Sequence, residues 1–306
     1  MSRSVRSLLA LLLAACVAGP PLVSGCARTE PVEPPAPPLA PELDRLPASS
    51  VAVVRVALGG PLGALAAQAV AASGERLQCL GKMIPSLSSI TVGFVPRGRD
   101  FATMMFLDGP VAAEAVDGCG TELAKAFAMR PLPEGSSPAV RSAGGATGKP
   151  APGWILALDL DVDRPPTGVR GPLAVAYSRL ANYPVVLAAT GGAALRQLSG
   201  MAATYLPLSS MGEAADQIAA MAYGLAPHPD GTAAVRLEVE LLDSAAAESL
   251  ARQAREIGRI TALDGEKVAW QELRGMLRDV VVRRIGARRV QVDATLTSAG
   301  FASLLR

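Results

Sequence analysis

The sequence predicts an α+β fold made of two β-α-β-β-α units, each with helices packed against an antiparallel sheet. Two observations predict this class. Short stretches of alternating or continuous apolar residues, typical of strands, are interleaved with stretches whose apolar residues recur at helical spacing. The same order of elements also occurs twice, with starts about 180 residues apart, although the residues themselves are not alike.

The first unit is expected at residues 49–130. Val51–Leu58 forms a continuous apolar run and predicts a buried strand, after which Gly59-Gly60-Pro61 opens a helix. Residues 88–95 alternate and predict a second strand, and a turn leads into a third at Phe101–Leu107. A second helix is expected to begin after Asp108-Gly109-Pro110 and to run to about residue 128.

The second unit is expected at residues 231–306. Its first strand, Val235–Leu241, alternates apolar with charged residues, and a helix follows at 245–262. A hairpin over Val280–Ile285 and Arg288–Leu296 and a short last helix complete the unit. This order matches the opening of a ferredoxin-like split β-α-β, in which both helices cover one face of the sheet.

Residues 131–152 are rich in glycine and proline and are expected to form a linker or loop. Residues 153–230 are expected to connect the two units, and the two sheets either stay separate or join into one extended sheet. The connecting strands are predicted at Trp154–Val162, Leu173–Ser178 and Tyr183–Thr190, and the connecting helices at Ala193–Ala203 and Ser210–Leu225.

The N-terminus has the pattern of an export signal. Two arginines precede an apolar run, Leu8–Ala18, that is too short to span a bilayer, which needs roughly twenty apolar residues. The following Val23-Ser24-Gly25-Cys26 resembles the lipobox of bacterial lipoproteins. The resemblance implies that residues 1–25 are a signal peptide, and that Cys26 is lipidated and becomes the new N-terminus. Lipidation of Cys16, after Leu13-Ala14-Ala15, and an ordinary secretory signal are the alternatives.

The resemblance implies a protein of the cell envelope that is bound to a membrane through its lipid. Residue 27 is Ala and not Asp, which in Gram-negative members of the family favours the outer membrane. Residues 26–48 are rich in proline and poor in core residues, and they predict a tether that holds the body up to roughly 60 Å from the lipid. The body, particularly Leu46–Val54, also looks like uncharacterised duplicated α+β exported proteins of GC-rich bacteria, which implies no function.

The mature chain has no net charge, because removing residues 1–25 removes two arginines and no acid from a chain of net charge +2. A neutral chain argues against a nucleic-acid partner. Two cysteines remain beyond the anchor, Cys79 and Cys119, and an oxidising compartment makes them a candidate disulfide. The ferredoxin-like geometry would bring them close together. Two separate buried thiols are the alternative.

Motifs for catalysis or cofactors are weak. His228 is the only histidine and lies between two prolines, which indicates an exposed turn and excludes a histidine-rich zinc signature. Asp159, Asp161 and Asp163 project from one side of a predicted strand and could hold Ca²⁺, although a solvated strand face explains them more simply. The sequence predicts no metal and no cofactor, and it favours a non-catalytic protein over an enzyme without deciding between them.

Five arginines give the C-terminal hairpin a basic surface. It could meet anionic lipid headgroups, peptidoglycan or an acidic envelope protein, although arginines on the polar side of a hairpin need no partner. We therefore expect a non-catalytic binding or assembly module. The alternatives are an envelope hydrolase with an atypical carboxylate site and a carrier of an apolar ligand. The hairpin arginines are Arg278, Arg283, Arg284, Arg288 and Arg289.

Overall fold

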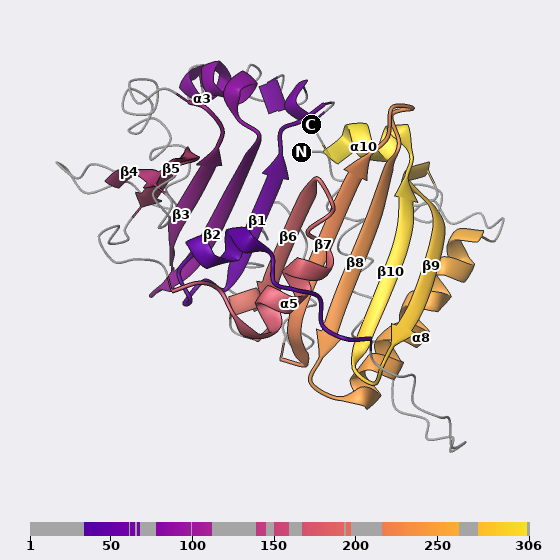
Figure 1. Cartoon of the computed structure of the whole chain (residues 1–306). Helices are drawn as coiled ribbons and strands as arrows, with labels where there is room; N and C mark the ends of the chain where they lie inside the picture. The colour runs from indigo at the N-terminus through magenta and orange to yellow at the C-terminus, as the bar shows by residue number, and fades with distance from the viewer. Residues whose placement is uncertain are drawn as a thin grey trace. The chain divides into compact units, whose positions relative to one another are not determined.

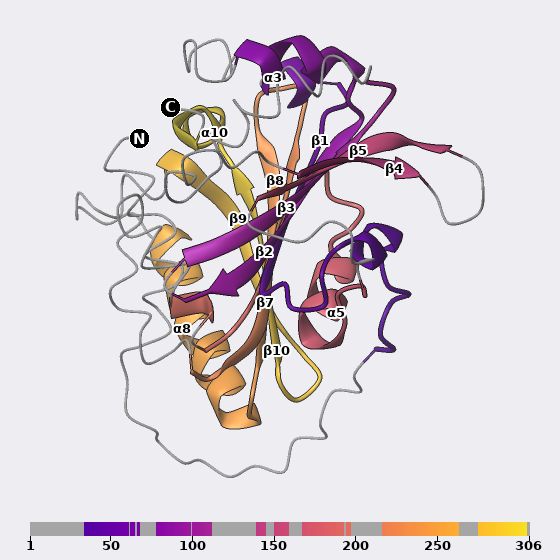
Figure 2. The same cartoon turned by 90° about the vertical axis from the view of Figure 1, so that its left-hand side faces the viewer.

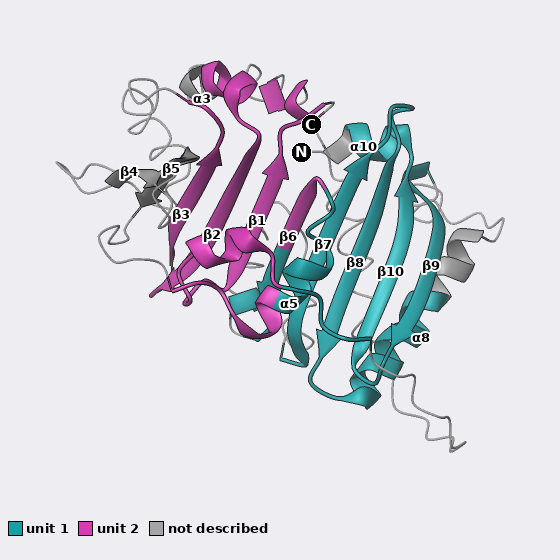
Figure 3. Ribbon diagram, viewed as in Figure 1, with its two compact units in different colours: residues 1–38, 175–183, 188–306 teal, residues 39–174, 184–187 magenta. Residues whose placement is uncertain are grey.

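The computed structural model shows an α+β chain whose strands pair mainly antiparallel, so the predicted class is confirmed (Figure 1). The chain divides into two compact units, which are described one at a time (Figure 3). Unit 1 comprises residues 1–38, 175–183 and 188–306, and unit 2 comprises residues 39–174 and 184–187. The structure describes residues 34–60, 62–64, 66–67, 78–98, 100–111, 139–144, 150–158, 167–192, 194–196, 216–262 and 275–304.

Unit 2 is built on strands that pair antiparallel in the order β4-β5-β3-β2-β1. The alternating residues 88–95 and the following apolar run form neighbouring strands, joined by a turn at Gly98, whose φ of 62° suits glycine. The strands are β1 (Ala52–Ala57), β2 (Ser89–Arg97), β3 (Asp100–Asp108), β4 (Ala139–Gly144) and β5 (Pro150–Leu158).

One apolar cluster of unit 2 lies where helical turns close over one end of these strands. The helix α3 (Gln78–Met83) continues into the 3-10 helix η3 (Ile84–Ser86). Apolar side chains of this segment pack against the strands, and their burial positions the chain as it enters β2. The buried cluster comprises Leu58, Met83, Ile84, Leu87, Val92, Met105 and Leu107.

Unit 1 pairs its strands antiparallel in the order β7-β8-β10-β9, and the helix α8 (Ser244–Ala262) lies on one face of them (Figures 1 and 2). Asp243 caps this helix by accepting the N–H of Ala246 at 2.7 Å. The strands are β6 (Val185–Thr190), which begins in unit 2, β7 (Ile218–Pro227), β8 (Ala233–Leu241), β9 (Leu277–Ile285) and β10 (Arg289–Leu296). The last helix is α10 (Ser298–Leu304).

The predicted pair of ferredoxin-like units is not confirmed, because the two segments pair their strands differently. Strands β8 and β9, which α8 joins, both pair antiparallel with β10 between them, so they are parallel to each other, as in a split β-α-β. In unit 2 this prediction is wrong, because β1 pairs directly and antiparallel with β2. The order of elements along the chain is the same in both halves, but it does not specify which strands pair.

Two connecting elements were predicted with the wrong type. The expected strand Leu173–Ser178 lies in a helix, α5 (Gly171–Arg179), whose buried Leu173, Ala174 and Tyr177 recur at helical spacing. The expected helix Ser210–Leu225 ends in strand β7. Strand β7 is buried on both faces. Its residues therefore form a continuous apolar run, and such a run shows neither the two-residue repeat of a strand nor the 3.6-residue repeat of a helix.

Two expected segment boundaries also move. The predicted linker, residues 131–152, contains β4 and the start of β5. The predicted tether, residues 26–48, ends in the 3-10 helix η1 (Pro41–Arg45), and Leu43 and Leu46 are completely buried. The burial of these two leucines shows that the end of the predicted tether packs against the body, although the stretch is rich in proline. None of the helices in the described ranges is long and apolar enough to cross a membrane.

Candidate functional site

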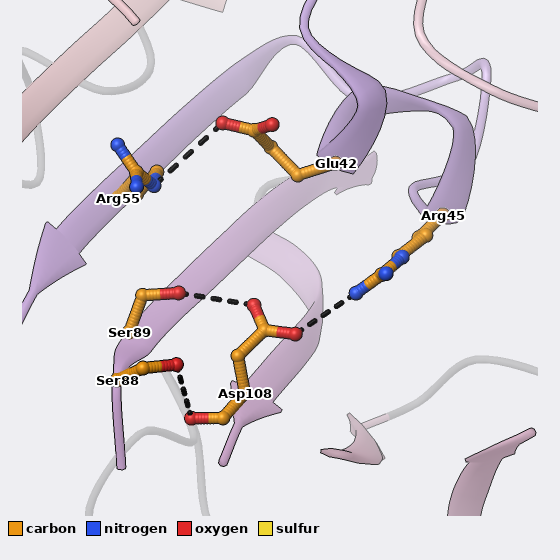
Figure 4. A network of polar contacts seen from close by, with 6 residues as sticks. All are labelled: Glu42, Arg45, Arg55, Ser88, Ser89 and Asp108. Atoms are coloured by element: carbon orange, nitrogen blue, oxygen red, sulfur yellow. Dashed lines mark hydrogen bonds and ion pairs between the residues drawn. The ribbon is translucent and has the colours of Figure 1, made fainter. Parts of the chain in front are cut away.

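A first polar network surrounds η1 in unit 2 (Figure 4). Arg45 extends from η1 and contacts the carboxylate of Asp108, at the end of β3, with 2.9 Å between Nη1 and Oδ1. The other carboxylate oxygen of Asp108 accepts a hydrogen bond from the buried Ser89 hydroxyl at 3.0 Å. Because Asp108 is held from β2 and from η1 together, it fixes where η1 lies on the strand ends.

All the charged side chains of η1 are paired in the same way. Glu42 lies 3.6 Å from Arg55 of β1, and Asp44 lies 2.8 Å from Arg170. The Arg45 guanidinium carbon also lies 5.0 Å from the centre of the Phe106 ring, within cation-π range. The charges therefore orient η1 on the sheet, and we call residues 39–46 the docked segment.

Apolar burial and backbone bonds complete the contact. A Cβ on Gly93 of β2 would lie 3.1 Å from Leu46 Cδ2, so the glycine leaves the space that Leu46 occupies. The carbonyl oxygens of Leu43 and Leu46 accept the N–H groups of Val169 and Gly168 at 2.9 and 3.1 Å. The docked segment thus has buried contacts with the sheet and backbone contacts with residues 168–169.

A second polar network lies in unit 1, on the face of β8 and β10 opposite α8. Charged and amide side chains alternate along both strands, and the register sets them side by side. Their neighbours on the other face are apolar and buried. The cross-strand pairs are Arg289 with Glu240, Gln291 with Glu238, and Asp293 with Arg236.

The carboxylates of this charged face have arginine partners. Arg179 of α5 lies 3.1 Å from Glu240 and 4.0 Å from Glu238. Asp293 is contacted by Arg236 at 2.6 Å and by Arg283 at 2.7 Å. The network therefore connects β8, β9 and β10 with Arg179, at the end of α5, and all of its residues belong to unit 1.

Glu238 is the buried centre of the charged face, with 6% of its surface exposed. Burial raises the pKa of its carboxyl, against the opposing pull of the Arg289, Arg179 and Arg236 charges. Beside it, Tyr183 lies over Gly224, where a Cβ would come within 2.7 Å of the ring. A carboxyl with a raised pKa takes up a proton nearer to neutral pH than an ordinary glutamate, so this network can respond to pH.

The five hairpin arginines do not lie on one surface. Arg289 is buried, with 4% of its surface exposed. Arg284 points to the α8 face, where it lies 3.9 Å from Glu248, whereas its neighbour Arg283 points to the charged face. The exposed members are Arg278, Arg283 and Arg288, and their predicted binding role stays a prediction.

His228 lies in the turn between β7 and β8 and is exposed, as expected. Its N–H donates to the Thr232 carbonyl at 2.8 Å. In the same turn, hydrogen bonds from the Thr232 hydroxyl and N–H hold the pKa of Asp230 below its usual range. Nothing about this turn indicates catalysis. Within the described ranges there is no group of three or more acidic, histidine or cysteine residues that could hold a metal ion.

Several predicted site residues lie outside the described residues. This set includes the cysteine predicted to be lipidated and its alternative. It also includes one cysteine of the predicted disulfide and the three aspartates, so the roles of all these residues stay predictions. Cys79 lies in α3, but its side chain is not described, and the geometric argument for its disulfide is lost because β1–β3 do not form a split β-α-β. The residues outside the description are Cys16, Cys26, Cys119, Asp159, Asp161 and Asp163.

Sequence reasoning missed the two networks. Arg179, Tyr183 and the docked segment gave no signal, because each depends on contacts between residues far apart in the chain. One signal for the charged face was present in the sequence. Arg289, Gln291 and Asp293 alternate with apolar residues along β10, and β8, which pairs with it, alternates in the same way.

No family model matches the sequence, and no curated protein matches it. Among solved structures, crystal form I of TP0453 is similar, with a TM-score of 0.47 and 10% identity, covering 88% of this chain and 97% of that chain. Crystal form III of TP0453 has a TM-score of 0.46 and 13% identity, covering 92% of this chain and 99% of that chain. A likeness this distant has no bearing on function.

Proposed function

We propose that this chain is a membrane-anchored lipoprotein of the cell envelope whose body is a non-catalytic binding or assembly module. The lipobox-type sequence at Cys26 and the proline-rich stretch after it support the anchor. The observation that carries the binding role is the exposure of Arg278, Arg283 and Arg288 on the C-terminal hairpin. Its partner would be anionic.

The duplicated ferredoxin-like scaffold is not part of this proposal. The two β-α-β-β segments pair their strands differently, so the proposal relies on the N-terminal motif and the hairpin surface alone.

The anchor is tested by intact mass spectrometry of the protein extracted from membranes, with and without reduction. The expected mass is that of the chain from Cys26 plus acyl groups, and it should rise by about two daltons on reduction if Cys79 and Cys119 are bonded. An unacylated mass would reject the anchor. An acylated chain that begins at Cys16 would correct its position.

The binding role is tested with two charge-matched variants in crosslinked envelopes. Arg278→Gln with Arg288→Gln removes two exposed hairpin charges, and Arg252→Gln with Arg255→Gln removes two exposed charges of α8. The hairpin variant should lose most crosslinked partner, and the α8 variant should retain it. Equal recovery from both variants would reject the hairpin as the binding surface.

A further inference from the structure

We propose that the docked segment, residues 39–46, locks the membrane tether onto unit 2, so that only the residues between Cys26 and the docked segment act as a spacer. The inference rests on the proposed anchor for its meaning in the cell, although the contact itself does not depend on the lipid. A spacer of about a dozen residues reaches roughly 40 Å, against roughly 60 Å for a tether that extends to residue 48.

Burial is the first argument for a lock. A free tether would expose Leu43 and Leu46 to water, yet neither has any exposed surface. The space for Leu46 depends on the missing side chain of Gly93, which lies in the middle of β2, where a glycine weakens the strand. A close approach by another part of the chain explains this glycine, and Leu46 makes that approach.

Matched polar partners are the second argument. The charges at Glu42, Asp44 and Arg45 pair with Arg55, Arg170 and Asp108, which belong to three different parts of unit 2. One docking position satisfies all three pairs, so the segment has one orientation as well as one location.

Backbone hydrogen bonds are the third argument, and they also provide a measurement. The Gly168 and Val169 N–H groups donate to carbonyl oxygens of the docked segment. If the segment detached, both amides would lose these acceptors and exchange with solvent. Their exchange rates therefore report docking from residues that lie far from the tether in the sequence.

The test is hydrogen exchange on the full purified chain, read by NMR or by mass spectrometry of short peptides. Docking predicts that the amides of Leu43, Leu46, Gly168 and Val169 exchange at least ~100-fold more slowly than the unprotected rate. Leu46→Asp should return the Gly168 and Val169 amides to within about tenfold of the unprotected rate while β8 keeps its protection. Unprotected Gly168 and Val169 amides in the natural chain would overturn the proposal.

Two further variants keep the test decisive. Leu39→Asp changes an exposed residue of the same segment and should leave the exchange rates unchanged. If Leu46→Asp unfolds the whole chain, Leu46→Ala replaces it, because it removes the buried apolar contact without introducing a charge. Gly168 and Val169 exchange as slow in Leu46→Ala as in the natural chain would then reject the lock. The lipid plays no part in these measurements, so a failed anchor would appear only in the mass spectrum.

Discussion

The docked segment and the charged face of β8 and β10 both use arginine–carboxylate pairs, but they differ in what is buried. In the docked segment the leucines are buried, while the side chains of Arg45 and Asp108 keep 39% and 24% of their surface exposed. At the centre of the charged face the ions themselves are buried, with 4% exposure at Arg289 and 6% at Glu238, whereas the side chains of Arg236 and Asp293 keep 32% and 22% of their surface exposed.

This difference in burial decides which interactions hold each region together. Partly exposed pairs are typically worth about 0–1 kcal/mol, because water already solvates both charges well. Removing one partner of a buried pair costs about 3–5 kcal/mol, because it leaves a charge without compensation in a poorly solvated place. We infer that apolar burial holds the docked segment and that the charges orient it. The charged face depends on the ions themselves.

The largest expected effect is that of Arg289→Met. Arg289 is itself buried, and its positive charge lowers the pKa of the buried Glu238, so its loss leaves the carboxyl with less compensating charge around it. The free energy of unfolding should fall by about 3–5 kcal/mol at pH 7, as measured by urea denaturation. Arg288→Met, at the exposed neighbouring position, should change it by less than about 0.5 kcal/mol. Similar losses in both variants would contradict the burial argument.

Leu46→Ala comes second. Truncating a fully buried leucine removes apolar contact and leaves a cavity, which typically costs about 2–4 kcal/mol. The matched control is Leu39→Ala in the same segment, where 38% of the side chain is exposed and the loss should stay below about 1 kcal/mol. Both values come from urea midpoints. A small loss at residue 46 would mean that the docked segment does not contribute to the stability of the body.

The third prediction is a pH dependence from Glu238. Its pKa in the folded chain is raised by burial, so the folded state keeps this proton to a higher pH than the unfolded state. The group therefore favours the folded state most below the unfolded pKa, and that contribution is lost as pH rises through the folded pKa.

The corresponding variant is Glu238→Gln, which cannot titrate. The stability of the natural chain minus that of the variant should decrease between the ordinary glutamate pKa and the raised one, and stay level at higher pH. Parallel urea series at several pH values measure this difference. A difference that increases with pH would show that the arginines outweigh burial and that the pKa of Glu238 is lowered.

The sequence predicted those parts of the fold whose pattern is local. The alternation in Val235–Leu241 identified β8 and both of its faces, because a half-buried strand repeats every two residues. The helix α8 was predicted to within a residue at each end, since its apolar residues recur at helical spacing and Asp243 caps it. The hairpin of β9 and β10 was predicted for the same kind of reason.

The parts that were not predicted depend on distant contacts. The order of elements along the chain is the same in both halves. It does not show that β1 and β2 pair directly, whereas β8 and β9 are separated by β10. The composition of a proline-rich stretch also predicts that it does not pack. Only the structure shows that Gly93, about fifty residues later in the chain, leaves room for Leu46. Only part of the charged face was predictable from the sequence. Its strand residues alternate in a recognisable way, but Arg179 contacts the face from a helix that was predicted as a strand.

The smallest expected effect is that of Asp108→Asn, and it tests the orienting role of the exposed charges. The amide keeps the size of the carboxylate. Its single oxygen can still accept the hydrogen bond from Arg45, and its NH2 group can donate to the Ser89 hydroxyl oxygen, so the charge and one acceptor are lost. A double-mutant cycle with Arg45→Gln should give a coupling free energy of about 0.5 kcal/mol, decreasing as salt is added. The Gly168 amide should remain protected in both single variants, because Leu43 and Leu46 stay buried. A coupling above about 2 kcal/mol would mean that this pair behaves as a buried one, and the distinction between the two networks would then fail.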